Sequence, residues 1–187
     1  KNAPVAIMID TKGPEIRVKQ FADGKIFLED NSTFTLTTKD VVGDQEKVSV
    51  TYKNLPKILK KDAKILLNDG NLEFKVTKIT NCDVVCKIVH GGELSNNKSI
   101  NIPGIKTDMP YLSEQDKSDL IFAKEMKANY IAISFVNCAD DVLQVKNFLK
   151  EINFKNVKII SKIESEESVS NFDKILKVSD GIMVARG

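Results

Sequence analysis

Two charged residues stand at the end of an apolar stretch, at a spacing that could bring both into one site. The sequence VKIISKIESEES, residues 157–168, begins like a buried strand and then carries Lys162 and Glu164 two positions apart. Alternate residues of a strand point to the same face, so we expect both side chains on one side and Ile163 on the other. Such a pair suits phosphoryl or enolate chemistry, because a carboxylate binds Mg²⁺ together with substrate phosphates and an ammonium stabilises developing negative charge.

Two other interpretations of this pair remain open. Lys162 and Glu164 could form a solvated ion pair worth about 0 to 1 kcal/mol, and Glu164 would also suit the first turn of a following helix. Alternatively, a lysine at the end of an α/β-barrel strand could form a Schiff base with a carbonyl substrate, as in class I aldolases.

The surrounding sequence alternates strand and helix patterns. Apolar runs typical of buried strands occur at residues 4–10, 130–135, 157–161 and 182–185. Apolar residues with helical spacing lie between the strand runs at 130–135, 157–161 and 182–185. Ser113, with Asp116 three residues later, predicts the start of another helix before residue 130. A further helix is predicted with Val169, Phe172 and Leu176 on one face. Continuous apolar strands separated by helices indicate a parallel sheet covered on both faces.

Polar residues follow each of these four apolar runs. Asp10 and Thr11 end the first, Ser134 the second, Lys162 and Glu164 the third, and Arg186 and Gly187 the fourth. The carboxyl ends of parallel strands meet at one rim, where α/β proteins bind their ligands. We therefore predict a site at this rim.

Residues 17–102 have a different pattern, in which apolar and polar residues alternate over short segments. Examples are TFTLTT at 33–38, KVSVTY at 47–52 and LEFKVTKI at 72–79, with turn sequences such as Asn68-Asp69-Gly70-Asn71 between them. This predicts a small closed or nearly closed β-barrel.

The β-rich stretch interrupts the α/β pattern between a parallel strand and the helix that should follow it. The predicted fold is therefore α/β, a partial (β/α)8 TIM barrel with an inserted all-β barrel lid domain. We expect residues 1–12 to form a barrel strand, 13–108 the inserted domain, and 109–187 further βα units.

The composition limits the partners of the chain. Its net charge of +2 comes from 28 basic and 26 acidic residues mixed along 187 positions, which predicts no nucleic-acid partner. No apolar run approaches the roughly 20 residues that span a bilayer, so no membrane partner is expected. Cys82, Cys86 and Cys138 show no disulfide-scaffold spacing, which favours the cytoplasm.

Cys82, Cys86 and His90 recur every four residues and could suggest a metal site. Their stretch has the pattern of a strand, in which positions four apart lie about 13 Å from each other, too far to share one ion. Structural thiols and a surface histidine are the better interpretation.

Three motifs together resemble one enzyme family. DTKGPEIR at 10–17, IISKIES at 159–165 and SDGIMVARG at 179–187 are similar to pyruvate kinase, and the resemblance covers essentially the whole chain. It implies a segment of the barrel A domain with the mobile B domain as the inserted lid. It also implies a cytoplasmic, homotetrameric phosphotransferase that converts phosphoenolpyruvate and ADP to pyruvate and ATP, the last step of glycolysis. The implied cofactors are Mg²⁺ or Mn²⁺ and K⁺.

The resemblance implies roles for residues at the rim. Lys162 matches the catalytic lysine that stabilises the transferring phosphoryl group and the forming enolate, and Glu164 matches a ligand of the divalent ion. Asp10 and Thr11 match K⁺ ligands, Thr11 through its backbone carbonyl. The backbone N–H of Gly187 matches a contact to the substrate carboxylate.

Further matches lie in or beside the inserted stretch. Arg17 and Lys98 match contacts to nucleotide phosphates, and Glu15 matches a position that implies K⁺ dependence. From the residues alone, Lys98 could be any solvated lysine, and Asp10 with the following Gly13-Pro14 could simply turn the chain into the insertion.

The family's motifs extend past both ends of this sequence. In the family, an aspartate that is the second divalent-metal ligand follows the position of Gly187. We therefore expect a piece of a larger enzyme whose isolated 187 residues are inactive. A non-catalytic nucleotide or phosphate binding module is the alternative.

Overall fold

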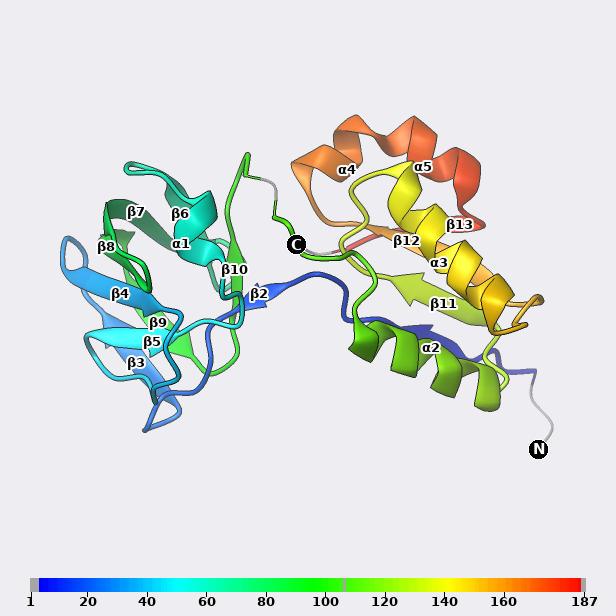
Figure 1. Cartoon of the computed structure of the whole chain (residues 1–187), viewed down its shortest axis with the longest axis horizontal. Coiled ribbons are helices and arrows are strands. Elements are labelled where there is room, and N and C mark those ends of the chain that lie inside the picture. The colour runs from blue at the N-terminus through cyan, green and yellow to red at the C-terminus, as the bar shows by residue number, and fades with distance from the viewer. Residues whose placement is uncertain (1–3, 106, 186–187) are drawn as a thin grey trace. The chain divides into compact units, whose positions relative to one another are not determined.

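The computed structural model describes residues 4–105 and 107–185 and divides the chain into two compact units (Figure 1). Lys1–Pro14 and Met109–Gly187 form one, called here the strand–helix unit. Glu15–Asp108 form the other, the strand-rich unit.

The strand–helix unit contains a parallel sheet with the strand order β1-β11-β12-β13. Its strands are β1 (Met8–Asp10), β11 (Tyr130–Ile133), β12 (Lys158–Ile163) and β13 (Gly181–Val184). The register pairs Asp10 with Ala132, and Ile133 with Ser161, so the carboxyl ends of three neighbouring strands lie at the same edge. The four predicted parallel strands are confirmed.

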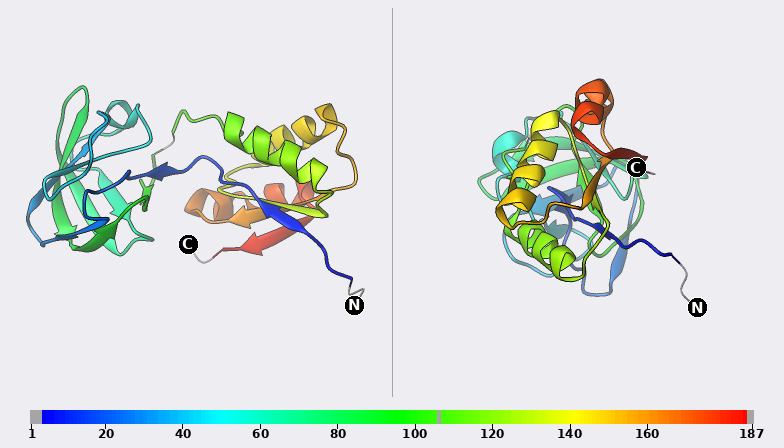
Figure 2. Two further views of the ribbon diagram at one scale, coloured as in Figure 1. Left: turned by 90° about the horizontal axis from the view of Figure 1, so that it is seen from below. Right: turned by 90° about the vertical axis from the view of Figure 1, so that its right-hand side faces the viewer.

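Four helices accompany this sheet: α2 (Glu114–Glu125), α3 (Ala139–Glu151), α4 (Glu166–Ser170) and α5 (Phe172–Val178). They lie along one face of it (Figure 2), where Ile131 and Ile159 share a buried core with Leu120 and Val145. On the opposite face Lys162 is half-buried and Tyr130 exposed. The prediction of a sheet covered on both faces is therefore wrong for the described residues, in which helices pack on one face as on the outside of a barrel.

One predicted helix start agrees with the structure, whereas the last predicted helix does not. The predicted start at Ser113 is confirmed, because its side chain accepts a hydrogen bond from the backbone N–H of Asp116 in a capping box. The last predicted helix is instead two, which meet at Asn171. This break changes the buried face, so that Ile175 is buried while Val169 and Leu176 are exposed.

The strand-rich unit contains a seven-stranded sheet with the order β2-β10-β6-β7-β8-β4-β5 and a separate pair, β3-β9. Its elements are β2 (Ile16–Arg17), β3 (Lys25–Leu28), β4 (Thr33–Thr37), β5 (Lys47–Ser49), α1 (Leu55–Ile58), β6 (Lys64–Leu67), β7 (Leu72–Ile79), β8 (Asp83–His90), β9 (Gly92–Ser95) and β10 (Ser99–Asn101). The sheet closes on itself, because an antiparallel bridge between Val18 and Val50 links the segments that follow its edge strands β2 and β5.

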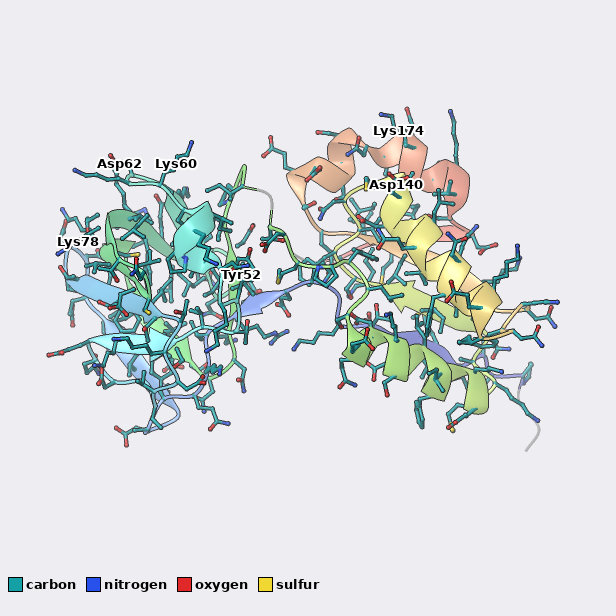
Figure 3. All side chains as sticks on the ribbon, viewed as in Figure 1. Tyr52, Lys60, Asp62, Lys78, Asp140 and Lys174 are labelled. Atoms are coloured by element: carbon teal, nitrogen blue, oxygen red, sulfur yellow. The ribbon has the colours of Figure 1, made fainter. Side chains whose placement is uncertain are left out.

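The interior of the strand-rich unit is apolar and its surface is charged. Phe34 and Phe74 pack edge to face with their ring centroids 6.0 Å apart. Figure 3 shows the charged side chains spread over the outside; Lys60 and Lys78 are exposed, whereas Tyr52 is buried. In the part of the chain that the structure describes, no helix has the length and apolar character needed to cross a membrane.

Candidate active site

Lys162 and Glu164 contact each other at the carboxyl end of β12. The Nζ atom of Lys162 lies 3.4 Å from Oε1 of Glu164, and their side chains are only 14% and 10% exposed. Strand alternation produces this arrangement, because Ile163 between them turns into the helix-covered core. The pair is therefore largely buried and differs from a solvated surface ion pair.

Lys162 also reaches across the sheet toward β1. Its Nζ atom lies 3.3 Å from both carboxylate oxygens of Asp10 and donates to Oγ of Ser134 at 2.9 Å. Asp10 is the last residue of β1, and Ser134 directly follows β11, the strand between β1 and β12. The strand order thus places one polar residue from each of three neighbouring strands around a single ammonium group.

The other oxygen of Glu164 is held by the backbone. Its Oε2 accepts a hydrogen bond of 2.7 Å from the N–H of Phe135. Phe135 has a φ of 55°, a left-handed conformation that few non-glycine residues adopt. This conformation turns the chain sharply after β11 and fixes the donor that orients Glu164.

Thr11 lies next to Asp10 and is buried. Its backbone carbonyl accepts a hydrogen bond of 2.6 Å from Oγ of Ser134, and its N–H donates to the carbonyl of Ala132 at 2.9 Å. The structure therefore brings Asp10, Thr11, Lys162 and Glu164 together at one rim, with Ser134 between them.

Asp116 holds the backbone near the rim in place, a role that the sequence did not indicate beyond its position in a predicted helix cap. It is almost completely buried, and its carboxylate accepts hydrogen bonds of 3.1 Å from the backbone N–H groups of Gly13 and Ser113. Gly13 has a φ of 68°, and a Cβ there would lie 2.7 Å from the carbonyl oxygen of Ser134. Only glycine fits this close approach.

Tyr111 supports the same carbonyl. Its hydroxyl donates to the carbonyl oxygen of Ser134 at 2.9 Å. Burial, with a smaller contribution from nearby carboxylates, raises the pKa of Tyr111, so this hydroxyl remains a donor at physiological pH. The segment after β11 is thus fixed from several sides.

The remaining predicted residues lie in the strand-rich unit or outside the described residues. Nε of Arg17 is 2.5 Å from Oε2 of Glu15, and its Nη1 donates to the carbonyl of Asn97 at 2.7 Å. The carbonyl of Lys98 accepts from the N–H of Val18 at 2.9 Å, so Arg17 and Lys98 occupy neighbouring strand segments. Gly187 and Arg186 lie outside the described residues.

The rim offers hard oxygen donors to a cation. These are the carboxylates of Asp10 and Glu164 and the carbonyl of Thr11, the donor types that Mg²⁺ and K⁺ accept, and Mg²⁺ usually takes only one or two protein carboxylates plus substrate oxygens. Across residues 4–105 and 107–185 there is no group of three or more His, Cys, Asp or Glu side chains that could hold a metal alone. These oxygen donors are compatible with a cation that completes its coordination with other ligands.

Cys82, Cys86 and His90 do not gather. They lie in or beside β8, where Cys86 is buried and His90 is exposed. Burial raises the pKa of the Cys86 thiol to about 12, which keeps it protonated and a poor metal ligand.

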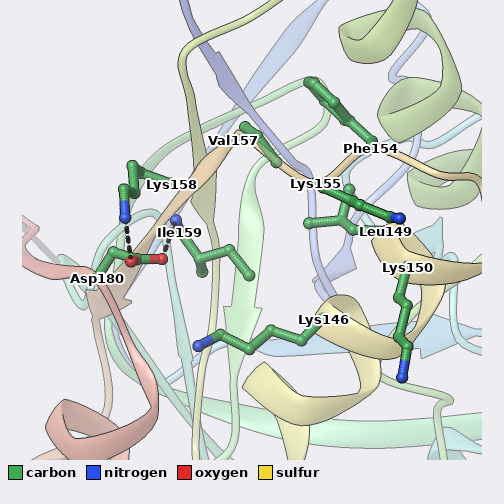
Figure 4. A pocket seen from close by; sticks show the side chains of 9 residues that line it. All are labelled: Lys146, Leu149, Lys150, Phe154, Lys155, Val157, Lys158, Ile159 and Asp180. Carbon is green, nitrogen blue, oxygen red and sulfur yellow. Dashed lines mark hydrogen bonds and ion pairs between the residues drawn. The ribbon is translucent and has the colours of Figure 1, made fainter.

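A cavity of about 440 Å³ lies at the other end of the sheet, around the start of β12 (Figure 4). Leu149, Phe154, Val157 and Ile159 line it with four lysines, and Lys158 pairs with Asp180 at 3.1 Å. None of the rim residues named above lines this cavity. We place the candidate site at the rim because side chains from several strands converge there.

A parallel strand–helix sheet with helices on one face and charged residues converging at its carboxyl edge is the arrangement typical of α/β-barrel proteins. Comparison with known protein families shows to which α/β-barrel family the chain belongs. The sequence profile described as "Pyruvate kinase, barrel domain" matches residues 1–187. The chain belongs to the pyruvate kinase family, and the predicted resemblance is confirmed.

Individual relatives agree with this assignment. "Pyruvate kinase" of Clostridium perfringens is 42% identical over 188 residues, which cover 100% of this chain and 40% of the relative. "Pyruvate kinase" of Geobacillus stearothermophilus is 41% identical over 185 residues, which cover 98% of this chain and 32% of the relative. The chain thus spans 32% to 40% of the length of these relatives.

Proposed function

We propose that the full-length protein transfers the phosphoryl group of phosphoenolpyruvate to ADP and releases pyruvate and ATP in the cytoplasm. The observation that carries this proposal is the largely buried contact between Lys162 and Glu164 at the carboxyl-end rim of a pyruvate kinase family chain. The chain covers part of such an enzyme, so the activity is assigned to the whole protein and not to these 187 residues alone.

We assign the catalytic role at the rim to Lys162. Its ammonium is fixed by Asp10 and Ser134, so it supplies a positioned charge for the phosphoryl group in transfer and for the enolate oxygen that forms. A preorganised charge of this kind stabilises the transition state without reorganising during the reaction.

We assign Glu164 as a ligand of Mg²⁺ or Mn²⁺. Oε2 is held by the N–H of Phe135, which leaves Oε1, beside Lys162, as the oxygen for the ion. When bound, a divalent ion neutralises charge on the phosphoryl oxygens. The hard oxygen donors of the rim fit this role.

We assign the K⁺ site to Asp10 and the carbonyl of Thr11. The hydrogen bond from Ser134 orients this carbonyl, and the carboxylate of Asp10 is 57% exposed, so it is accessible to a cation. Glu15, which is matched to K⁺-dependent family members, supports a requirement for K⁺.

The strand-rich unit, Glu15–Asp108, is proposed to be the mobile lid, the B domain of the family, which the sequence predicted over residues 13–108. Arg17 and Lys98 would contact the nucleotide phosphates, and their neighbouring positions on β2 and before β10 support a shared role. The backbone N–H of Gly187 is proposed to bind the substrate carboxylate. The full-length protein is proposed to be a homotetramer.

A coupled assay on the full-length protein tests the proposal. Pyruvate formed from phosphoenolpyruvate and ADP is reduced by lactate dehydrogenase, with Mg²⁺ and K⁺ each present or omitted. We expect turnover that requires both cations. Absence of turnover, combined with ADP binding to the 187-residue chain by calorimetry, would instead support a non-catalytic binding module. Borohydride trapping of a carbonyl substrate on Lys162 would support the aldolase alternative.

A further inference from the structure

The hydroxyl of Ser134 lies at the centre of the rim contacts. It accepts a hydrogen bond from Nζ of Lys162 at 2.9 Å. Its own hydrogen can be donated once, and the carbonyl of Thr11 at 2.6 Å is a closer acceptor than Asp10 at 3.1 Å. The hydroxyl therefore connects the ammonium of Lys162 to the backbone of Thr11.

The position of this hydroxyl is fixed by the fold. Ser134 is 3% exposed and follows the strand that lies between β1 and β12. Its carbonyl accepts from the hydroxyl of Tyr111 at 2.9 Å, and Gly13 packs against the same carbonyl. Asp10 also accepts hydrogen bonds from Lys162 but is more than half exposed, so Ser134 is the more rigid of these two hydrogen-bond partners.

We propose that Ser134 is a positioning residue for phosphoryl transfer, an inference that rests on the proposed function. Its oxygen takes one of the three hydrogens of the Lys162 ammonium and so fixes the direction of the other two. Ser134 acts through Lys162 and need not touch the substrate. Its loss should therefore lower kcat more than it raises KM, because misplacement of a catalytic group weakens transition-state stabilisation.

Ser161 provides a matched control. It is 0% exposed on the neighbouring strand β12, and its hydroxyl bonds Oγ of Ser179 at 2.6 Å rather than any rim residue. Ser134→Ala deletes a buried hydroxyl directly after β11, and Ser161→Ala deletes one within the adjacent strand β12, so a purely structural effect should be similar in both.

The test compares steady-state kinetics of the full-length wild type, Ser134→Ala and Ser161→Ala. Because Ser134 also orients the Thr11 carbonyl of the proposed K⁺ site, the kinetics are measured at saturating K⁺. Under these conditions we expect Ser134→Ala to lower kcat about tenfold or more, with both KM values within about threefold of wild type. Ser161→Ala should retain wild-type kcat. Mn²⁺ affinity, measured by titration without substrate, should stay unchanged in Ser134→Ala, because Glu164 is held by the N–H of Phe135.

If Ser134→Ala does not fold, Ser134→Cys replaces it. Cysteine has a similar size but its sulfur is only a weak hydrogen-bond acceptor, so we expect the same decrease in kcat. Equal kcat in the Ser134 and Ser161 variants would overturn the proposal, as would a loss confined to KM or to Mn²⁺ affinity. An inactive wild type would instead refute the proposed function, so the two failures are distinguishable.

Discussion

Replacing Lys162 by methionine removes the ammonium and keeps a side chain of similar length. Lys162 is 14% exposed and lies within 3.4 Å of Asp10, Ser134 and Glu164, so its charge acts in a partly desolvated site. Two unit charges about 4 Å apart at an effective dielectric constant of about 20 interact by about 4 kcal/mol. If this interaction serves the transition state, Lys162→Met should lower kcat by about 10³-fold, at about 1.4 kcal/mol per factor of ten.

The same strand offers the control for this substitution. Lys158 lies at the amino end of β12, is exposed, and pairs with Asp180 away from the rim. In the lactate dehydrogenase coupled assay on the full-length protein, Lys158→Met should keep wild-type kcat while Lys162→Met loses nearly all of it. A Lys162→Met variant within tenfold of wild type would refute the assignment of the catalytic charge.

Two further predictions concern stability. Gly13→Ala should lower the free energy of unfolding by about 2 to 3 kcal/mol, because it combines a positive φ with a clash, whereas Gly24→Ala, with a positive φ and open space, should cost only about 1 kcal/mol; urea unfolding of the variants checks the difference. The hydrogen bond from the Tyr52 hydroxyl lowers the pKa of the Asp108 carboxyl, so its stabilisation is present above the unfolded pKa of about 4 and is lost as the pH falls through the lower folded value. Tyr52→Phe should therefore be less stable than wild type at neutral pH and approach it in strong acid, and equal differences at both pH values would contradict this.

The convergence of polar side chains at the carboxyl edge could be predicted because the signals for it are local. A period of two residues was enough to place Lys162 and Glu164 on one face, and the polar residues after the first three apolar runs identified the carboxyl edge. The strand order then brought Asp10 within reach of Lys162, although the two are far apart in the sequence.

The parts that the sequence missed depend on backbone geometry and on contacts between distant segments. The bond from the N–H of Phe135 to Glu164 carries no signature in residue type, because every non-proline residue has this donor. The bond between Asp116 and Gly13 joins residues whose proximity depends on the packing of α2. The break at Asn171 likewise changed the buried face of the last helix without a proline or glycine to mark it.

The most direct test of the rim as a cation site is Mn²⁺ binding to the full-length protein, followed by electron paramagnetic resonance. Glu164→Gln keeps an oxygen that can accept from Phe135 but removes the charge, whereas Glu166→Gln changes an exposed residue in the first turn of α4. We predict that Glu164→Gln weakens Mn²⁺ binding at least about tenfold and that Glu166→Gln leaves it unchanged. Equal Mn²⁺ affinity in the wild type and both variants would contradict a divalent-ion site at Glu164.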